Sequence, residues 1–111
     1  MSELVNVYFK ERKIKIFVEK TGFLRKGLGL MFKNRNTGNL LFEFNKDAKI
    51  SLTSFFVFFP FLVLWLDEKS RVIESRIVKP FRLSIRPRKE FRRIIEIPLN
   101  ARNKSVLDFF D

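Results

Sequence analysis

The sequence contains no cysteine and no histidine among its 111 residues. Without cysteine, the chain can form no disulfide, no thiolate metal site and no cysteine nucleophile. Without histidine, it lacks the usual general base near neutral pH and the commonest metal ligand. These absences exclude serine–histidine and cysteine–histidine catalysis and the common zinc sites. We therefore expect a protein that is not an enzyme and that binds no metal and no cofactor.

Charge is absent from one long stretch, residues 50–66, which is rich in phenylalanine. A membrane-spanning helix needs about 20 apolar residues, whereas serine and threonine dilute the start of this stretch and Pro60 interrupts it. The stretch therefore predicts two buried strands, at 50–58 and 61–66, and no transmembrane span. Residues 1–20 mix charged with apolar side chains and do not resemble a secretory signal peptide. We expect a cytoplasmic protein.

Hydrophobic residues make up 46% of the chain, which contains 15 phenylalanines but one tryptophan and one tyrosine. Phenylalanine buries a large area and has no polar atom to satisfy, so this composition favours a packed core. The length is usual for one domain. We expect residues 1–111 to fold as a single domain.

Basic residues outnumber acidic residues by 23 to 12, which gives a net charge of +11. The excess is uneven, because residues 69–111 carry 12 bases and 5 acids whereas residues 1–68 carry 11 bases and 7 acids. Such a surplus favours a polyanion partner such as nucleic acid. It can equally serve to keep a phenylalanine-rich domain in solution, and both interpretations stay open.

Alternating or continuous apolar patterns predict further β-strands. These strands lie at residues 13–19, 40–44, 71–78, 81–86 and 91–97. In the stretch 81–86, one set of side chains is expected to face the core: Phe81, Leu83 and Ile85. The intervening set is expected to face solvent: Arg82, Ser84 and Arg86.

Polar stretches predict the loops and turns that separate these strands, at residues 33–39, 45–47 and 67–70. Thr21 is expected to cap a short helical turn over 23–26, and Asn100 a second one through Ser105. Three residues are expected to form the packing face of the second turn: Val106, Leu107 and Phe110. The fold class that follows is mainly β (β-rich α+β), a compact barrel-like or sandwich-like sheet with one or two short helices.

The order of these pieces resembles the family catalogued as domain of unknown function number 192, over about residues 13–100. The resemblance rests on Thr21 with Arg25 before Gly29-Leu30-Met31-Phe32-Lys33, on Leu40-Leu41-Phe42-Glu43-Phe44, on Pro60 through Asp67 with Arg71-Val72, and on Arg92 with Glu96-Ile97-Pro98. The family's polar Trp-Met-Lys-Asn-Thr stretch before the proline is replaced here by residues 53–57, and an acid after the proline by Leu62. The resemblance implies a compact β-rich fold and no established activity.

The strongest candidate binding feature is a late set of bases. It comprises Arg82, Arg86, Arg88, Lys89, Arg92 and Arg93. Guanidinium groups bind phosphate through paired hydrogen bonds, so the set predicts weak, sequence-independent binding of nucleic acid or another polyanion. Stacking on bases is not expected, because Phe81 and Phe91 are predicted to lie in the core. The alternative is an edge strand that carries charge to resist aggregation.

Two other functions stay open. A phenylalanine-rich surface could serve a protein-interaction or self-associating module; the sequence does not specify an oligomeric state. A carboxylate-based enzyme would use Asp67 and Glu68, but neighbouring strand residues point apart and an exposed turn does not raise a carboxyl pKa. We therefore predict that these acids only shape a turn. The stretch Gly27-Leu28-Gly29 lacks the third glycine and the lysine of a phosphate loop.

Overall fold

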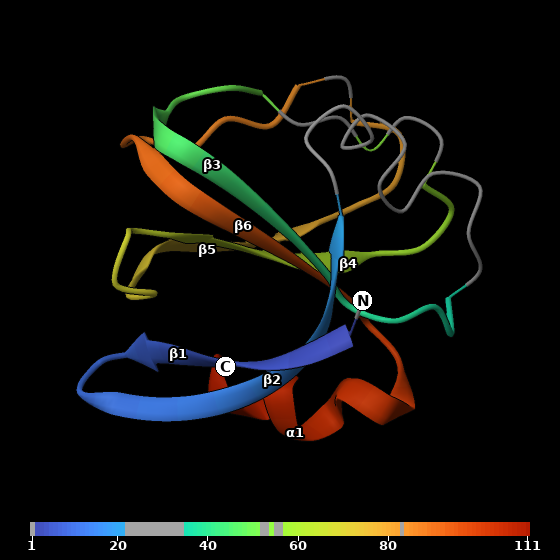
Figure 1. Ribbon diagram of the computed structural model, residues 1–111. Helices are drawn as coiled ribbons and strands as arrows, with labels where there is room; N and C mark the ends of the chain where they lie inside the picture. The colour runs from blue at the N-terminus through green and yellow to red at the C-terminus, as the bar shows by residue number, and fades with distance from the viewer. Residues whose placement is uncertain (1, 22–34, 52–53, 55–56, 83) are drawn as a thin grey trace.

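The computed structural model describes residues 2–21, 35–51, 54, 57–82 and 84–111. Its strands are β1 (Ser2–Phe9), β2 (Arg12–Thr21), β3 (Leu40–Ala48), β4 (Phe61–Leu66), β5 (Val72–Val78) and β6 (Phe91–Pro98). A 3-10 turn, η2 (Ala101–Asn103), leads into one short helix, α1 (Lys104–Phe109). The strands form a single sheet in the order β1-β2-β3-β6-β4-β5 (Figure 1). The predicted mainly β fold class is confirmed.

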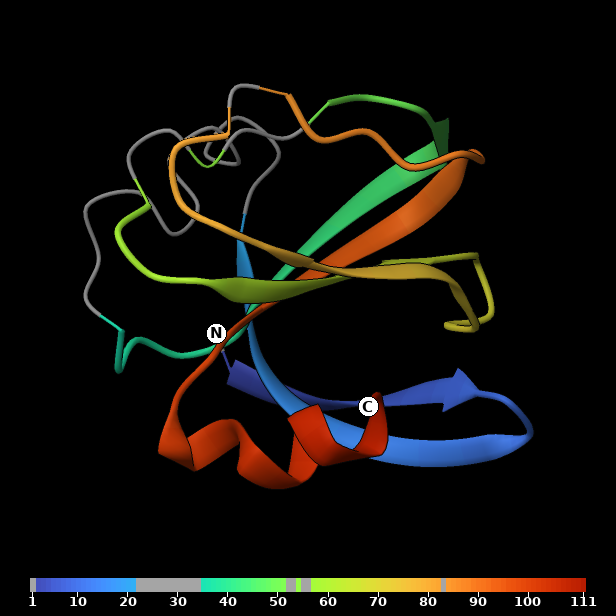
Figure 2. The same ribbon diagram turned by 180° about the vertical axis from the view of Figure 1, so that it is seen from behind.

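The sheet curls until its first and last strands meet. All neighbouring pairs are antiparallel except β2 and β3. At one end of the sheet, the backbone N–H of Tyr8 in β1 donates to the carbonyl of Ser70 at 3.0 Å, and Tyr8 bridges to Arg71 beside β5. Helix α1 packs against β2, beside the β1–β2 hairpin (Figure 2). The arrangement is the barrel-like alternative of the prediction.

Strand β4 explains the continuous apolar run, because all six of its residues are buried. Its odd-numbered side chains enter what we name the loop-side core: Leu40, Phe42, Val57, Phe59, Phe61, Val63, Trp65, Val78, Ile85, Phe91 and Ile94. Its even-numbered side chains enter the helix-side core: Val7, Ile16, Val18, Leu41, Leu62, Leu64, Leu66, Ile95, Ile97 and Val106. A strand with hydrophobic cores on both faces has no reason to alternate polar and apolar residues.

Most sequence-predicted elements are confirmed. Strands cover the predicted stretches 13–19, 40–44, 61–66 and 91–97, and β5 covers all but the first residue of 71–78. The predicted cap at Asn100 is present, since its side-chain oxygen accepts a hydrogen bond from the Asn103 N–H at 3.1 Å. Val106, Leu107 and Phe110 pack into the helix-side core, as predicted.

Three predictions are wrong. The turn at 45–47 lies inside β3, where the pairing register with β6 shifts between Glu43 and Ala48. The described residues of 50–58 form no strand, and neither do those of 81–86. Strand β1 was not predicted, because its apolar residues do not alternate with polar ones and Val7 is its only buried residue.

Several predictions fall outside the described residues. They concern the helical turn over 23–26, the glycine stretch 27–29, the start of the loop 33–39 and the inward placement of Leu83. The described part of that loop, 35–39, contains no strand or helix, as predicted.

Candidate functional site

Four of the six predicted bases lie on one exposed segment between β5 and β6. We name residues 79–89 the basic segment; it carries five bases and no acid. The five are Lys79, Arg82, Arg86, Arg88 and Lys89, and all of them are exposed. Figure 1 shows the segment leaving β5, passing over one end of the sheet and returning to β6.

A buried serine holds the start of the basic segment. Ser54 is fully buried, and its hydroxyl donates to the Lys79 carbonyl at 2.8 Å and accepts from the Arg82 N–H at 2.8 Å. The Ser54 N–H donates to the Arg82 carbonyl, and the Ser54 carbonyl accepts from the Phe81 N–H, both at 2.8 Å. These four bonds occupy the backbone groups of residues 79–82 that a strand would use for its ladder, so this stretch is a turn.

The same four bonds fix Phe81, which is one member of an exposed aromatic pair. Phe81 has φ 65°, a left-handed conformation that costs a bulky residue about 1–3 kcal/mol. Phe81 is 54% exposed and Phe58 is 56% exposed. Their rings pack edge-on, with the centroids 5.6 Å apart at 70°. The prediction that Phe81 faces the core is therefore wrong. In contrast, Ile85 is buried, and Arg82, Ser84 and Arg86 are exposed, as predicted.

A second anchor holds the end of the basic segment. The Glu74 carboxylate accepts hydrogen bonds from the Arg88 N–H at 2.9 Å and from the Arg76 guanidinium. Arg76 also donates to the Arg86 carbonyl at 3.2 Å. Burial alone would raise the pKa of Glu74, but the Arg88 N–H and the Arg76 guanidinium outweigh it and lower that pKa. Glu74 therefore stays charged at neutral pH and fixes the backbone at 86–88.

The other two predicted bases are held in ion pairs on β6. Arg92 pairs with Asp47 at 3.3 Å, and Arg93 pairs with Glu43 at 3.1 Å. Successive strand residues point to opposite faces of a sheet, so these two guanidiniums do not converge. Glu43 also binds Lys20 at 2.7 Å, which raises the pKa of that lysine. The structure thus separates Arg92 and Arg93 from the exposed bases of the basic segment.

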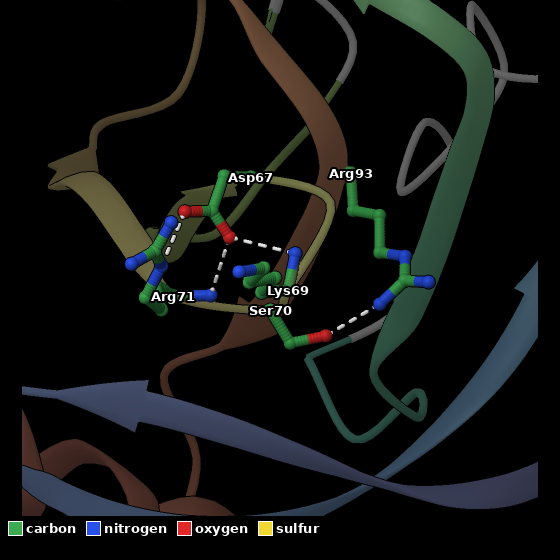
Figure 3. Close-up of polar contacts among 5 residues, drawn as sticks. All are labelled: Asp67, Lys69, Ser70, Arg71 and Arg93. Carbon is green, nitrogen blue, oxygen red and sulfur yellow. Dashed lines mark hydrogen bonds and ion pairs between the residues drawn. The ribbon is translucent and has the colours of Figure 1, made fainter.

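Asp67 shapes the turn between β4 and β5 (Figure 3). Its carboxylate accepts from the N–H groups of Lys69 at 2.8 Å and Arg71 at 2.9 Å, and it pairs with the Arg71 side chain at 2.7 Å. Burial alone would raise the pKa of Asp67, but these hydrogen bonds outweigh it and lower the pKa. Figure 3 also shows Arg93 donating to the Ser70 hydroxyl. The prediction that Asp67 serves the turn is confirmed.

The buried acid Glu96 was not among the predicted site residues. It lies on β6 between Leu40 of β3 and Val63 of β4, and it is 5% exposed. Burial raises the pKa of its carboxyl to about 8, and no described residue forms a hydrogen bond or ion pair with it. At neutral pH the group is therefore mostly protonated. The signal in the sequence was a lone acid inside the apolar run Ile94 to Ile97.

The described residues contain no group of three acidic, histidine or cysteine side chains that could hold a metal ion. Over the same residues, no helix is long and apolar enough to cross a membrane.

Known proteins share the fold of this chain. No family model matches the chain, so the resemblance to domain of unknown function number 192 stays a prediction. Crystal structures of two bacterial proteins share the fold. One, from Sinorhizobium meliloti and provisionally assigned as a transcription regulator, has a TM-score of 0.78 at 17% identity, over 96% of this chain and 86% of that protein. The other, of unknown function and from Novosphingobium aromaticivorans, has a TM-score of 0.77 at 14% identity, over 95% and 78%.

A UPF0127 protein from Pyrococcus horikoshii is related in sequence. It is 33% identical over 91 residues, which cover 80% of this chain and 77% of the relative. Because both the identity and the coverage of this match are substantial, the chain belongs to the UPF0127 family.

Proposed function

We propose that this protein binds polyanions, nucleic acid among them, through the basic segment and without sequence specificity. The observation that carries the proposal is an exposed segment with five bases and no acid. In the described part of the chain, the side chains of Arg86, Arg88 and Lys89 form no ion pair with a carboxylate. Such side chains can neutralise phosphates and release their counterions.

The anchored backbone supports this proposal. Ser54 holds residues 79–82, and Glu74 with Arg76 holds residues 86–88. A fixed backbone limits the freedom that the segment would lose on binding, which favours affinity. A partner of this kind suits a cytoplasmic protein, the location that the sequence predicts. The neighbour assigned provisionally as a transcription regulator shares only the fold, which does not carry that role to this chain.

The experiment is a fluorescence anisotropy titration with a labelled oligonucleotide at 50 mM and 200 mM salt. We expect micromolar binding at 50 mM that is largely lost at 200 mM. The variant Arg88→Gln/Lys89→Gln is expected to bind about tenfold more weakly at 50 mM salt, because it removes two phosphate contacts. Its matched control is Lys13→Gln/Lys15→Gln, which removes the same charge from exposed positions on β2.

An equal loss in both variants would attribute binding to net charge and not to the basic segment. The absence of any binding at 50 mM salt by micromolar protein would refute the function itself.

A second candidate function is self-association, favoured by an exposed apolar pair on the edge hairpin. Leu4 of β1 and Phe17 of β2 lie directly opposite each other, and each is 60% exposed. Exposed apolar pairs of this kind occur at protein interfaces. Sedimentation velocity over a hundredfold concentration range tests this candidate. A dimer that Phe17→Lys abolishes would support it, and a monomer at every concentration would dismiss it.

A further inference from the structure

Phe58 and Phe81 differ from the buried phenylalanines of the loop-side core beside them. Phe42, Phe59, Phe61 and Phe91 are each at most 2% exposed, as the hydrophobic effect requires of a side chain without polar atoms. Phe58 and Phe81 are each more than half exposed. Their exposure is therefore a local property that needs its own explanation.

The exposure of Phe81 is built into the backbone. The residue adopts a positive φ that bulky side chains avoid, and the buried Ser54 holds it there through bonds to Lys79, Phe81 and Arg82. A strained residue that its surroundings over-determine is typical of a functional site. Here the result of the strain is a ring presented to solvent.

Positive charge accompanies the aromatic pair. Lys79 and Arg82 flank Phe81 in sequence, both are exposed, and the rest of the basic segment follows without an acid. Aromatic rings beside a basic track are the arrangement that binds single-stranded nucleic acid, because each base presents a π-face whatever its identity. A duplex keeps its base faces stacked inside, so it cannot use such rings.

We infer that the polyanion bound by the basic segment is single-stranded nucleic acid, with the Phe58–Phe81 pair as the surface on which a base stacks. This inference rests on the proposed function. The exposed lysine and arginine side chains bind phosphates, and the aromatic pair adds a preference for unpaired nucleobases. A protein that binds through its basic side chains alone would have an affinity for a single strand, an abasic strand or heparin that depends only on the charge of each.

The test compares four probes at 50 mM salt: a 12-residue oligothymidylate, an oligouridylate of equal length, an abasic strand of equal length and a 12-base-pair duplex. We expect either single strand, DNA or RNA, to bind about tenfold more tightly than the abasic strand, the contribution of about one stacked base. The duplex should bind no more tightly than its charge predicts.

The variant Phe58→Leu/Phe81→Leu keeps two exposed apolar side chains and removes both π-faces. We expect this variant to bind the abasic strand as tightly as the unchanged protein does and to lose the tenfold preference for strands that carry nucleobases. Phe81→Asn serves as the folding control, since asparagine tolerates a positive φ; it should fold and lose most of the preference. The far-ultraviolet circular dichroism spectrum and the melting temperature verify that each variant is folded.

Two outcomes would overturn the inference and leave the proposed function intact. One is equal affinity for the oligothymidylate and the abasic strand. The other is a preference for strands with nucleobases that persists in the leucine variant. A failure of the proposed function is distinguishable, because no probe would then bind. A dimer of the unchanged protein that the leucine variant abolishes would assign the aromatic pair to self-association, which also overturns the inference.

Discussion

At the scale of single residues, the buried carboxyl of Glu96 makes the free energy of unfolding depend on pH. The unfolded carboxyl has a pKa of 4.5, whereas burial raises the folded value to about 8. Between these values the folded state keeps a proton that the unfolded state has released, so stability falls as pH rises. Below about pH 4.5 the penalty is absent, and above about pH 8 it is complete.

This sign gives the first prediction. The free energy of unfolding should fall by up to about 1.4 kcal/mol per pH unit between pH 5 and pH 8, and Glu96→Gln should remove most of that slope. Urea unfolding at four pH values measures it. Glu90→Gln, at an exposed position just before β6, is the control and should retain the slope. Parallel pH profiles for the unchanged protein and Glu96→Gln would contradict the account of this site.

Ser54 gives the second prediction at this scale. Ser54→Ala removes the partner of the Lys79 carbonyl and the Arg82 N–H in a part-buried turn. Leaving such groups unsatisfied should lower the free energy of unfolding by about 2–4 kcal/mol. The control is Ser84→Ala, which lies on the exposed side of the basic segment and should cost less than about 0.5 kcal/mol. Equal urea midpoints for the two variants would show that the two hydroxyl bonds of Ser54 do not hold the turn.

At the scale of elements, the β1–β2 hairpin contains a strained connection. Lys10 and Glu11 form its two-residue turn, with φ of 49° and 63°. Positive φ at both central positions is typical of a type I′ turn, for which asparagine followed by glycine is strongly preferred. The sequence therefore places two unfavourable residues in a turn that the pairing of Phe9 with Arg12 requires.

The third prediction follows from this turn. Lys10→Asn/Glu11→Gly should raise the free energy of unfolding by about 1 kcal/mol, measured as a higher urea midpoint. The control places the same asparagine–glycine pair one position later, as Glu11→Asn/Arg12→Gly. This variant puts glycine in β2 and should destabilise the protein. If both variants shift the midpoint in the same direction, turn geometry is not the cause.

Elements were predictable where burial dictates the pattern and unpredictable where a distant contact does. The six buried residues of β4 form a continuous apolar run, which is visible in the sequence. The sequence of the stretch 81–86 has the alternating pattern of a strand, and Ile85 is indeed buried between exposed neighbours. However, Ser54, 27 residues earlier than Phe81, takes the backbone groups of Phe81 and Arg82, and nothing local signals that bond.

The candidate site was predictable to the same extent. The bases themselves are visible in the sequence, and so is their concentration late in the chain. Their separation into exposed and paired groups depends on β3, which brings Glu43 and Asp47 to Arg93 and Arg92. The order of strands in a sheet decides such neighbours, and a single sequence does not encode that order in any local pattern.

At the scale of the whole molecule, the distribution of charge matters more than its sum. Five carboxylates are held in ion pairs with bases, namely Glu43, Asp47, Asp67, Glu74 and Asp108, and Glu96 is mostly protonated at neutral pH. The basic segment contains none of these acids, and its charge remains exposed. The basic segment therefore contributes five positive charges and no negative one, beside the exposed residues Phe58 and Phe81.

The most direct test of the central claim is a nuclear magnetic resonance titration of the uniformly ¹⁵N-labelled protein with a short oligothymidylate at 50 mM salt. We expect the largest amide shifts in residues 79–89 and at Phe58, with the β1–β2 hairpin nearly unchanged. Shifts spread evenly over all exposed bases, or concentrated on the hairpin around Lys13 and Lys15, would contradict a binding site on the basic segment.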